Sequence, residues 1–147
     1  MSVVLDEKIK KQLSEMFQKL NHPVQILFFS KEEGCDYCED TRQLLEEVSQ
    51  LSEKIYLDVL DIHRDRERAK AAGVDKTPGI VIAGRDGETV MDYGIRFAGI
   101  PAGSEFTSLI RDILMVSSRE SGLSAETKRY LSELKDPIHL EVFVTPT

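Results

Sequence analysis

The sequence predicts an α/β fold built on a mixed four-stranded sheet with helices on both faces. Short apolar runs typical of strands alternate with longer segments whose apolar residues recur every three or four positions, as in amphipathic helices. The last two apolar runs, by contrast, are separated only by a Gly-Arg-Asp-Gly turn at residues 84–87, which predicts an antiparallel hairpin. A βαβ unit followed by a helical crossover into a hairpin gives this mixed sheet.

The first predicted helix covers residues 5–20. Apolar residues such as Ile9 and Leu13 recur along it with lysine and glutamate between them. Asp6 is the expected N-cap, and Pro23 follows the point where the helix should end.

The next elements are predicted from the same signals of periodicity and turn chemistry. They are a buried strand at Val24–Ser30, a helix after the cysteines to about residue 53, a strand at 55–62, a helix at 64–72, strands at 80–83 and 89–93, and a helix at about 104–118. Gly73 is the expected C′ residue of the helix before it, and Ser104 is the expected cap of the helix after it. Residues 94–103 are predicted to be a glycine-rich connection.

Cys35 and Cys38 are the only cysteines of the chain, and they lie where the strand Val24–Ser30 gives way to a helix. Thiols three residues apart at a helix start share one face, and the positive end of the helix dipole favours a thiolate. These are the requirements of thiol–disulfide exchange, so both cysteines are the candidate catalytic residues.

The alternative interpretation of the cysteine pair is half of a zinc site. Zinc needs four ligands, no second cysteine pair exists, and His22, His63 and His139 are dispersed. We therefore expect no metal and no bound organic cofactor. Negative charges near the cysteines disfavour a thiolate, which suggests a mild exchanger rather than a strong oxidant. The acidic residues are Glu32, Glu33, Asp36, Glu39 and Asp40.

Charge and composition narrow the function classes. The net charge of −7 argues against nucleic acid and anionic membrane surfaces as partners. No apolar run reaches 18 residues, and residues 1–8 lack the pattern of a signal peptide. Because the two cysteines form one motif rather than a disulfide framework, we expect a cytoplasmic protein.

The segment 122–147 repeats the beginning of the chain. A helix at 124–134 and a strand at 138–144 are predicted, and residues 128–134 match residues 10–16. In both copies an X-Pro step joins the helix to the strand. We therefore expect residues 1–120 to form one complete domain and 121–147 the truncated start of a second. The alternative is chance similarity of two amphipathic helices.

The chain resembles the protein disulfide oxidoreductases, glutaredoxin-like proteins of thermophiles that contain two thioredoxin-fold units. The resemblance is carried by the Cys-Asp-Tyr-Cys motif, by Thr77-Pro78 before a strand, by Asp-Tyr-Gly-Ile-Arg at 92–96, and by Gly-Ile-Pro-Ala-Gly-Ser-Glu-Phe at 99–106. It implies a thioredoxin-like fold and covers one full unit and the first helix and strand of the next. The second Cys-x-x-Cys motif of the family is absent from this sequence.

The resemblance also implies roles for individual residues. Cys35 matches the attacking cysteine, and Cys38 matches the buried resolving cysteine. Pro78 matches a cis-proline that faces the disulfide, and Thr77 before it would offer backbone groups to an extended substrate. Apart from the resemblance, the position of Tyr37 between the cysteines leads us to expect that it lines the site and packs against the substrate; the alternative is simple packing on the helix surface.

These observations lead to one main function and two alternatives. The main function is a thiol–disulfide oxidoreductase acting on protein disulfides or dithiols, with a thioredoxin-reductase-like electron donor. One alternative is a non-catalytic thioredoxin-fold adaptor of a larger redox protein, and the other is a glutathione-dependent glutaredoxin. We also expect the tail to pack on the first unit or on a second copy, which would give a homodimer.

Overall fold

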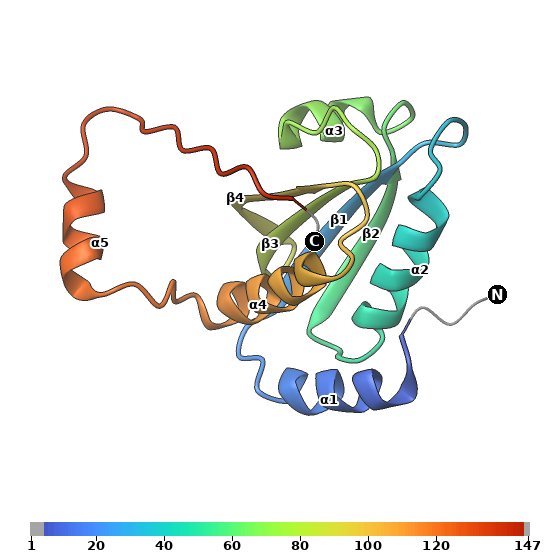
Figure 1. The fold of residues 1–147 in the computed structure, drawn as a ribbon, viewed down its shortest axis with the longest axis horizontal. Coiled ribbons are helices and arrows are strands. Elements are labelled where there is room, and N and C mark those ends of the chain that lie inside the picture. The colour runs from blue at the N-terminus through green and yellow to red at the C-terminus, as the bar shows by residue number, and fades with distance from the viewer. Residues whose placement is uncertain (1–4, 146–147) are drawn as a thin grey trace.

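A computed structural model describes residues 5–145 and contains one mixed sheet of four strands in the order β2-β1-β3-β4 (Figure 1). The strands are β1 (Val24–Ser30), β2 (Ile55–Asp61), β3 (Gly79–Asp86) and β4 (Thr89–Ala98). β1 pairs with β2 in parallel and with β3 antiparallel, and β3 and β4 form the hairpin. The predicted fold class is therefore confirmed.

The helices of residues 5–145 are α1 (Glu7–Phe17), α2 (Cys38–Ser49), α3 (Arg66–Ala72), α4 (Ser104–Ser118) and α5 (Ala125–Ser132). The first four cover the two faces of the sheet, whereas α5 buries no residue. α1, α2 and α4 contribute to the larger apolar core, and α3 packs on the smaller core across the sheet. No helix in residues 5–145 is both long and apolar enough to cross a membrane.

β1 is the central strand that fixes the site, because both of its faces are buried. Ile26 and Phe28 point into the larger core, whereas Leu27 and Phe29 point into the smaller one. Side chains alternate between faces along a strand, so a continuous apolar run is what a doubly covered strand requires. The C-terminal end of β1 is consequently held rigidly at Ser30, directly before the cysteine turn.

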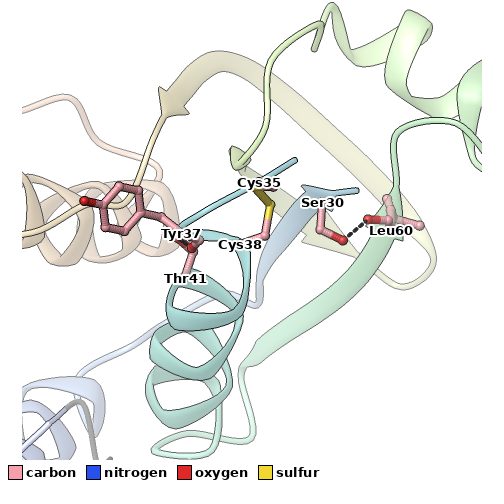
Figure 2. Close-up of a disulfide and its surroundings, with 6 residues drawn as sticks. All are labelled: Ser30, Cys35, Tyr37, Cys38, Thr41 and Leu60. Carbon is pink, nitrogen blue, oxygen red and sulfur yellow. Dashed lines mark hydrogen bonds between the residues drawn. A yellow bond between two sulfur atoms is a disulfide. The ribbon is translucent and has the colours of Figure 1, made fainter. Parts of the chain in front are cut away.

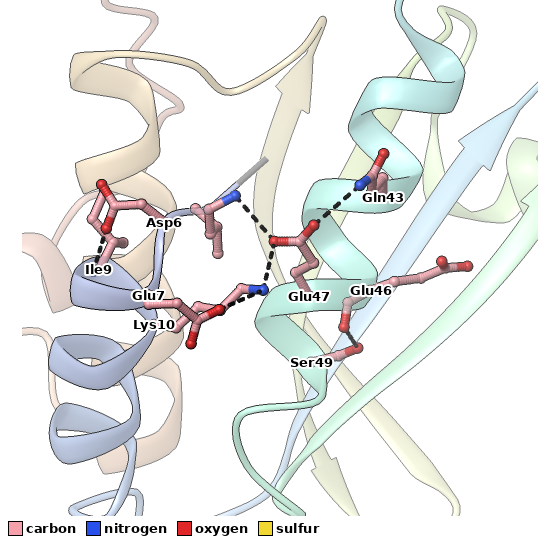
Figure 3. A network of polar contacts seen from close by, with 9 residues as sticks. Asp6, Glu7, Ile9, Lys10, Gln43, Glu46, Glu47 and Ser49 are labelled. Atoms are coloured by element: carbon pink, nitrogen blue, oxygen red, sulfur yellow. Dashed lines mark hydrogen bonds and ion pairs between the residues drawn. The ribbon is translucent and has the colours of Figure 1, made fainter. Parts of the chain in front are cut away.

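Polar contacts join α1 to α2 beside the larger core (Figure 3). Glu47 of α2 accepts a hydrogen bond from the backbone N–H of Leu5 at 3.0 Å and forms an ion pair with Lys10 at 3.5 Å. Gln43 donates to the other carboxylate oxygen of Glu47 at 3.2 Å. These contacts fix α1 along the helix that begins at Cys38.

The predicted helix ends are partly confirmed. Asp6 caps α1 by accepting a hydrogen bond from the N–H of Ile9 at 2.8 Å, and Gly73 ends α3 in the left-handed conformation. The prediction that Ser104 caps α4 is one residue off, since Gly103 occupies the N-cap position and Ser104 is the first helical residue. α2 ends at Ser49 rather than near residue 53.

The hairpin is longer than predicted. β3 continues through Asp86, so residues 84–86 belong to the strand rather than to the turn, and β4 continues to Ala98. Glycines made this region look like a connection, but the β3–β4 ladder runs across it with one irregularity between Ile82 and Gly84. Backbone pairing therefore overrides the local preference of glycine for turns.

The tail differs most from expectation. Ser124 caps α5 as the first residue of the predicted helix, but the predicted strand at 138–144 is absent and this segment is irregular. Every described residue from Glu120 to Thr145 is exposed, so the expected packing of the tail on the first unit is wrong. A strand needs a hydrogen-bonding neighbour, and no strand of the described sheet pairs with this segment. Residues 1–4 and 146–147 of the two predicted domains lie outside the described part of the chain.

Candidate functional site

Cys35 and Cys38 form a disulfide in the turn between β1 and α2 (Figure 2). Their Cα atoms are 5.5 Å apart, and the N–H of Cys38 donates to the carbonyl of Cys35 at 3.5 Å. Cys38 is the first residue of α2 and is 7% exposed, whereas Cys35 lies in the turn and is partly exposed. The helix thus begins at Cys38 rather than at Cys35. An incoming thiol or disulfide reaches Cys35 first.

The first turn of α2 is stabilised by hydrogen bonds from Thr41 rather than by an N-cap side chain. Tyr37 occupies the N-cap position without a side-chain hydrogen bond. The hydroxyl of the buried Thr41 donates to the carbonyl of Tyr37 at 2.6 Å, and its N–H donates to the same oxygen at 3.0 Å. Figure 2 shows the Tyr37 ring pointing away from the disulfide, and the residue is 57% exposed.

A cavity of about 380 Å³ opens beside the disulfide, and we call it the disulfide cavity. Its lining combines both cysteines and Phe28 with polar and charged residues from β1, the cysteine turn, α2, the end of β2 and the segment after it: Ser30, Lys31, Glu32, Glu39, Arg42, Asp61 and Arg64. The hydroxyl of Ser30 donates to the carbonyl of Leu60 at 3.2 Å, which ties β1 to β2 at the floor of the cavity (Figure 2). The cavity is therefore rigid on its strand side.

Sequence reasoning missed Ser30, Asp61 and Arg64 as neighbours of the cysteines. The signal that could have found them was the parallel pairing of β1 and β2, which places Ser30 directly beside Asp61. The carboxyl ends of parallel strands lie at the same edge of a sheet. Residues that follow β2 therefore meet the turn that follows β1.

Charges in the disulfide cavity are mixed rather than acidic. Arg64 pairs with Glu32 at 3.1 Å, and Arg42 pairs with Glu46 at 2.8 Å. Of the acidic residues that suggested a mild exchanger, Glu32 thus faces a cation from another segment, whereas Arg42 pairs with an acid of its own helix. The negative charge near Cys35 is therefore offset in part.

Asp61 is the buried acid of the cavity. Its carboxylate accepts hydrogen bonds from the N–H groups of Arg64 at 3.0 Å and His63 at 2.9 Å. These hydrogen bonds, that from Arg64 first, hold the pKa of the Asp61 carboxyl below its ordinary value. Asp61 thus keeps a negative charge at the end of β2 at neutral pH.

Thr77 and Pro78 lie at the same end of the sheet but outside the lining of the disulfide cavity. Their peptide bond is cis, which is the isomer that the family resemblance implies. Gly79 pairs with Phe29, so the buried Pro78 comes beside the end of β1, and its carbonyl accepts the N–H of Gly99 at 2.8 Å. Within residues 5–145 the N–H and carbonyl of Thr77 make no hydrogen bond.

No group of three or more histidine, cysteine or acidic side chains within residues 5–145 is arranged to hold a metal ion. The two sulfurs of the site can carry two-electron chemistry. A disulfide accepts two electrons to give two thiols, and two adjacent thiols return them when the disulfide forms again.

Comparisons with known proteins match almost the whole chain. The F subunit of alkyl hydroperoxide reductase in Xanthomonas campestris pv. phaseoli is 33% identical over 143 residues, covering 95% of this chain and 23% of that protein. A protein named NADH dehydrogenase in Bacillus subtilis is 29% identical, covering 99% of this chain and 25% of that protein. The chain thus spans about a quarter of the length of these relatives. No protein-family model matches it.

Solved structures give the same picture. A protein disulfide oxidoreductase from Aeropyrum pernix superimposes with a TM-score of 0.77 at 29% identity, covering 92% of this chain and 56% of that chain. The NTD_N/C domain of alkyl hydroperoxide reductase AhpF in Enterococcus faecalis gives a TM-score of 0.74 at 28% identity, covering 85% and 58%. The chain therefore has a thioredoxin-like fold, and it resembles both the protein disulfide oxidoreductases and the AhpF component of the alkyl hydroperoxide reductases.

Proposed function

We propose that this chain is a thiol–disulfide oxidoreductase unit that exchanges disulfides with protein substrates through Cys35 and Cys38. The observation that carries the proposal is the pairing of a partly exposed Cys35 with a buried Cys38 at the start of α2. One sulfur accessible to a partner and a second sulfur behind it are what a two-step exchange needs.

In the reducing direction, the Cys35 thiolate attacks one sulfur of a substrate disulfide. A mixed disulfide forms between Cys35 and the substrate, and the first substrate thiolate leaves. Cys38 then loses its proton and attacks the Cys35 sulfur, which releases the second substrate thiolate and forms the Cys35–Cys38 disulfide. The substrate gains two electrons and the chain loses two, so the reverse sequence oxidises a substrate dithiol.

We propose that Thr77 and Pro78 bind the substrate on the side of the disulfide opposite the end of β2. The N–H and carbonyl of Thr77 have no hydrogen-bond partner in the described part of the chain, so they can form strand-like hydrogen bonds with an extended peptide. Pro78 has no N–H to compete for that peptide. Tyr37, which is exposed and turned away from the disulfide, would contact only a substrate that extends past the start of α2.

The similarity to AhpF of the alkyl hydroperoxide reductases supports a place for this unit in an electron relay. We propose that a thioredoxin-reductase-like flavoprotein reduces the Cys35–Cys38 disulfide and that a protein disulfide receives the electrons. We further propose that residues 1–120 form the redox unit, that 121–147 begin a second unit, and that the protein works in the cytoplasm. The exposed tail is proposed to mediate self-association.

The test is to equilibrate the protein in a series of glutathione redox buffers, trap free thiols by alkylation and measure masses. We expect one reversible two-electron transition between about −120 and −300 mV, the span from strong exchange catalysts to structural disulfides. Reduced wild-type protein should also reduce the disulfides of insulin. Cys35→Ser should abolish this turnover, and Cys38→Ser should accumulate the mixed disulfide with Cys35.

The adaptor alternative predicts a different result. Cys35→Ser would then change the unfolding midpoint without changing any turnover, because wild-type protein would have none. A pair of thiols that is always alkylated or never alkylated across the buffers would contradict the exchange proposal in the same way.

A further inference from the structure

The Asp-Tyr-Gly-Ile-Arg segment of β4, residues 92–96, makes a group of polar contacts that have no part in the proposed reaction. Register fixes its geometry: Gly84 pairs with Met91, but Ile82 pairs with Ile95. The three β4 residues 92–94 therefore lie opposite the single β3 residue Ala83. This is a bulge, and Gly94 within it has a φ of +85°, which glycine adopts without strain.

The bulge brings Asp92 and Arg96 together. Residues four apart in a regular strand are separated by about 13 Å, too far for a direct ion pair. Here Arg96 donates through its two terminal nitrogens to the two oxygens of Asp92, at 2.9 and 2.6 Å. The N–H of Gly94 donates to the same carboxylate at 2.9 Å. The guanidinium is thus held in one orientation by a bidentate pair.

The remaining nitrogen of the guanidinium reaches another element. Nε of Arg96 donates to the carbonyl of Ala72, the last residue of α3, at 2.9 Å. A carbonyl at a helix C-terminus has no partner within its own helix, so a cation is well placed there. We call the three residues Asp92, Arg96 and Ala72 the β4–α3 clamp.

The clamp lies at the base of the loop 73–78, which carries Thr77 and Pro78. A cavity of about 140 Å³ lies between the loop and β4, with Arg96 in its lining, whereas Val74 of the loop packs on the smaller apolar core. At its far end the loop is tied to β4 by the hydrogen bond from the N–H of Gly99 to the carbonyl of Pro78. At Gly79 a Cβ would lie 2.6 Å from Val74 and 2.7 Å from the Lys76 carbonyl, so the loop folds tightly on itself.

We infer that Arg96 is a positioning residue that sets the placement of Thr77 and Pro78 by fixing the end of α3 against β4. The inference rests on the proposed function for its substrate, but its structural half does not. Without the Arg96 side chain, the end of α3 loses its hydrogen bond to β4. Among the hydrogen bonds of residues 5–145, the one from Gly99 to Pro78 then attaches the loop to the end of β4. The loop would then adopt many conformations, and an extended substrate would no longer find Thr77 and Pro78 in a single arrangement.

The test compares Arg96→Ala with Arg68→Ala. Arg68 is the matched control, because it is an arginine of α3 that pairs with Asp58 of β2 at 2.8 Å, and within residues 5–145 its side chain makes no hydrogen bond to a clamp residue. We expect Arg96→Ala to speed hydrogen exchange at the Gly99 amide roughly tenfold or more, with little change at the β1 amides. It should also raise KM for insulin roughly tenfold, while the redox potential of the cysteine pair stays the same. Arg96→Lys keeps the positive charge but cannot make the bidentate hydrogen bonds to Asp92. It should therefore bring the Gly99 exchange rate and the KM only part of the way back to their wild-type values.

Two results would overturn the inference. If the Gly99 amide exchanges at the same rate in Arg96→Ala and Arg68→Ala, the hydrogen bonds of Arg96 do not hold the loop. A wild-type KM in an Arg96→Ala protein whose Gly99 amide exchanges faster would show that the clamp holds the loop but that substrate binding does not depend on it. If the wild type reduces no disulfide at all, the proposed function fails, and the Gly99 measurement still decides whether the clamp positions the loop.

Discussion

Asp92 shows at the scale of one residue how the fold sets the charge of a side chain. Its pKa is lowered from 3.8 to about 2, first by the hydrogen bonds from Arg96 and then by that from the Gly94 N–H. The carboxylate is 45% exposed and the Arg96 side chain 30%, so solvent screens the pair in part. The shift therefore reports on geometry more than on a large contribution to stability.

Arg96→Ala should raise the pKa of Asp92 toward its ordinary value, although the Gly94 N–H keeps part of the shift. A carboxyl with a lower pKa in the folded state stabilises the fold fully above its unfolded pKa and loses that effect as the pH falls through the folded value. The contribution of Asp92 should thus disappear between about pH 4 and pH 2 in the wild type. Carbon-detected NMR titration measures the pKa directly. An unchanged midpoint in the variant would contradict the assigned cause.

Ser117 connects elements in the same way that Arg96 does, but on the other face of the sheet. It is buried at the end of α4, and its hydroxyl accepts the N–H groups of Asn21 and His22 at 2.9 and 3.2 Å. The same hydroxyl donates to the carbonyl of His22 at 2.8 Å. One side chain thus fixes the turn between α1 and β1 against α4.

Ser117→Ala should lower the free energy of unfolding by about 1–3 kcal/mol, because it removes three hydrogen bonds, each with a net contribution of about 0.5–1.5 kcal/mol. The N–H of His22 keeps its hydrogen bond to the backbone carbonyl of Ser117 at 3.2 Å. Urea unfolding measures the change. The matched control is Ser118→Ala, whose exposed hydroxyl donates to Met115 at 2.9 Å and should matter by less than about 0.5 kcal/mol. Equal effects of the two changes would mean that the turn at residues 21–22 is held by packing alone.

Elements set by their own sequence were predicted well, and elements set by contacts with other parts of the chain were not. β1 was predicted with its exact bounds because its apolar run is a property of the sequence itself. β4 was predicted five residues too short, since Gly94 needs a bulge that only pairing with β3 defines. In the candidate site, spacing alone placed the two cysteines together, and the structure joins them in a disulfide. Arg64 and Asp61 were missed because strand pairing, not sequence distance, brings them to the disulfide.

At the scale of the whole molecule, the tail stands apart from the redox unit. Figure 1 shows α5 away from the sheet, joined to the unit by the segment that follows α4. The segment after α5 leaves large apolar side chains in solvent, with Leu140 85%, Val142 86% and Phe143 88% exposed. An ion pair between Lys128 and Glu120 at 2.8 Å joins α5 to the end of the unit. Exposed apolar clusters of this kind favour association.

Deleting residues 121–147 should therefore leave the unfolding midpoint of the redox unit within about 2 °C of the full chain, since exposed residues contribute little to its core. The same deletion should remove self-association, measured by light scattering over a range of protein concentrations. The change Val142→Asp in the full chain isolates the apolar contribution, because it charges the tail without shortening it, and it should give the same loss of association. A full chain that stays monomeric at all concentrations would contradict the prediction of a homodimer. A large drop in the midpoint on deletion would show instead that the tail stabilises the unit that carries Cys35 and Cys38.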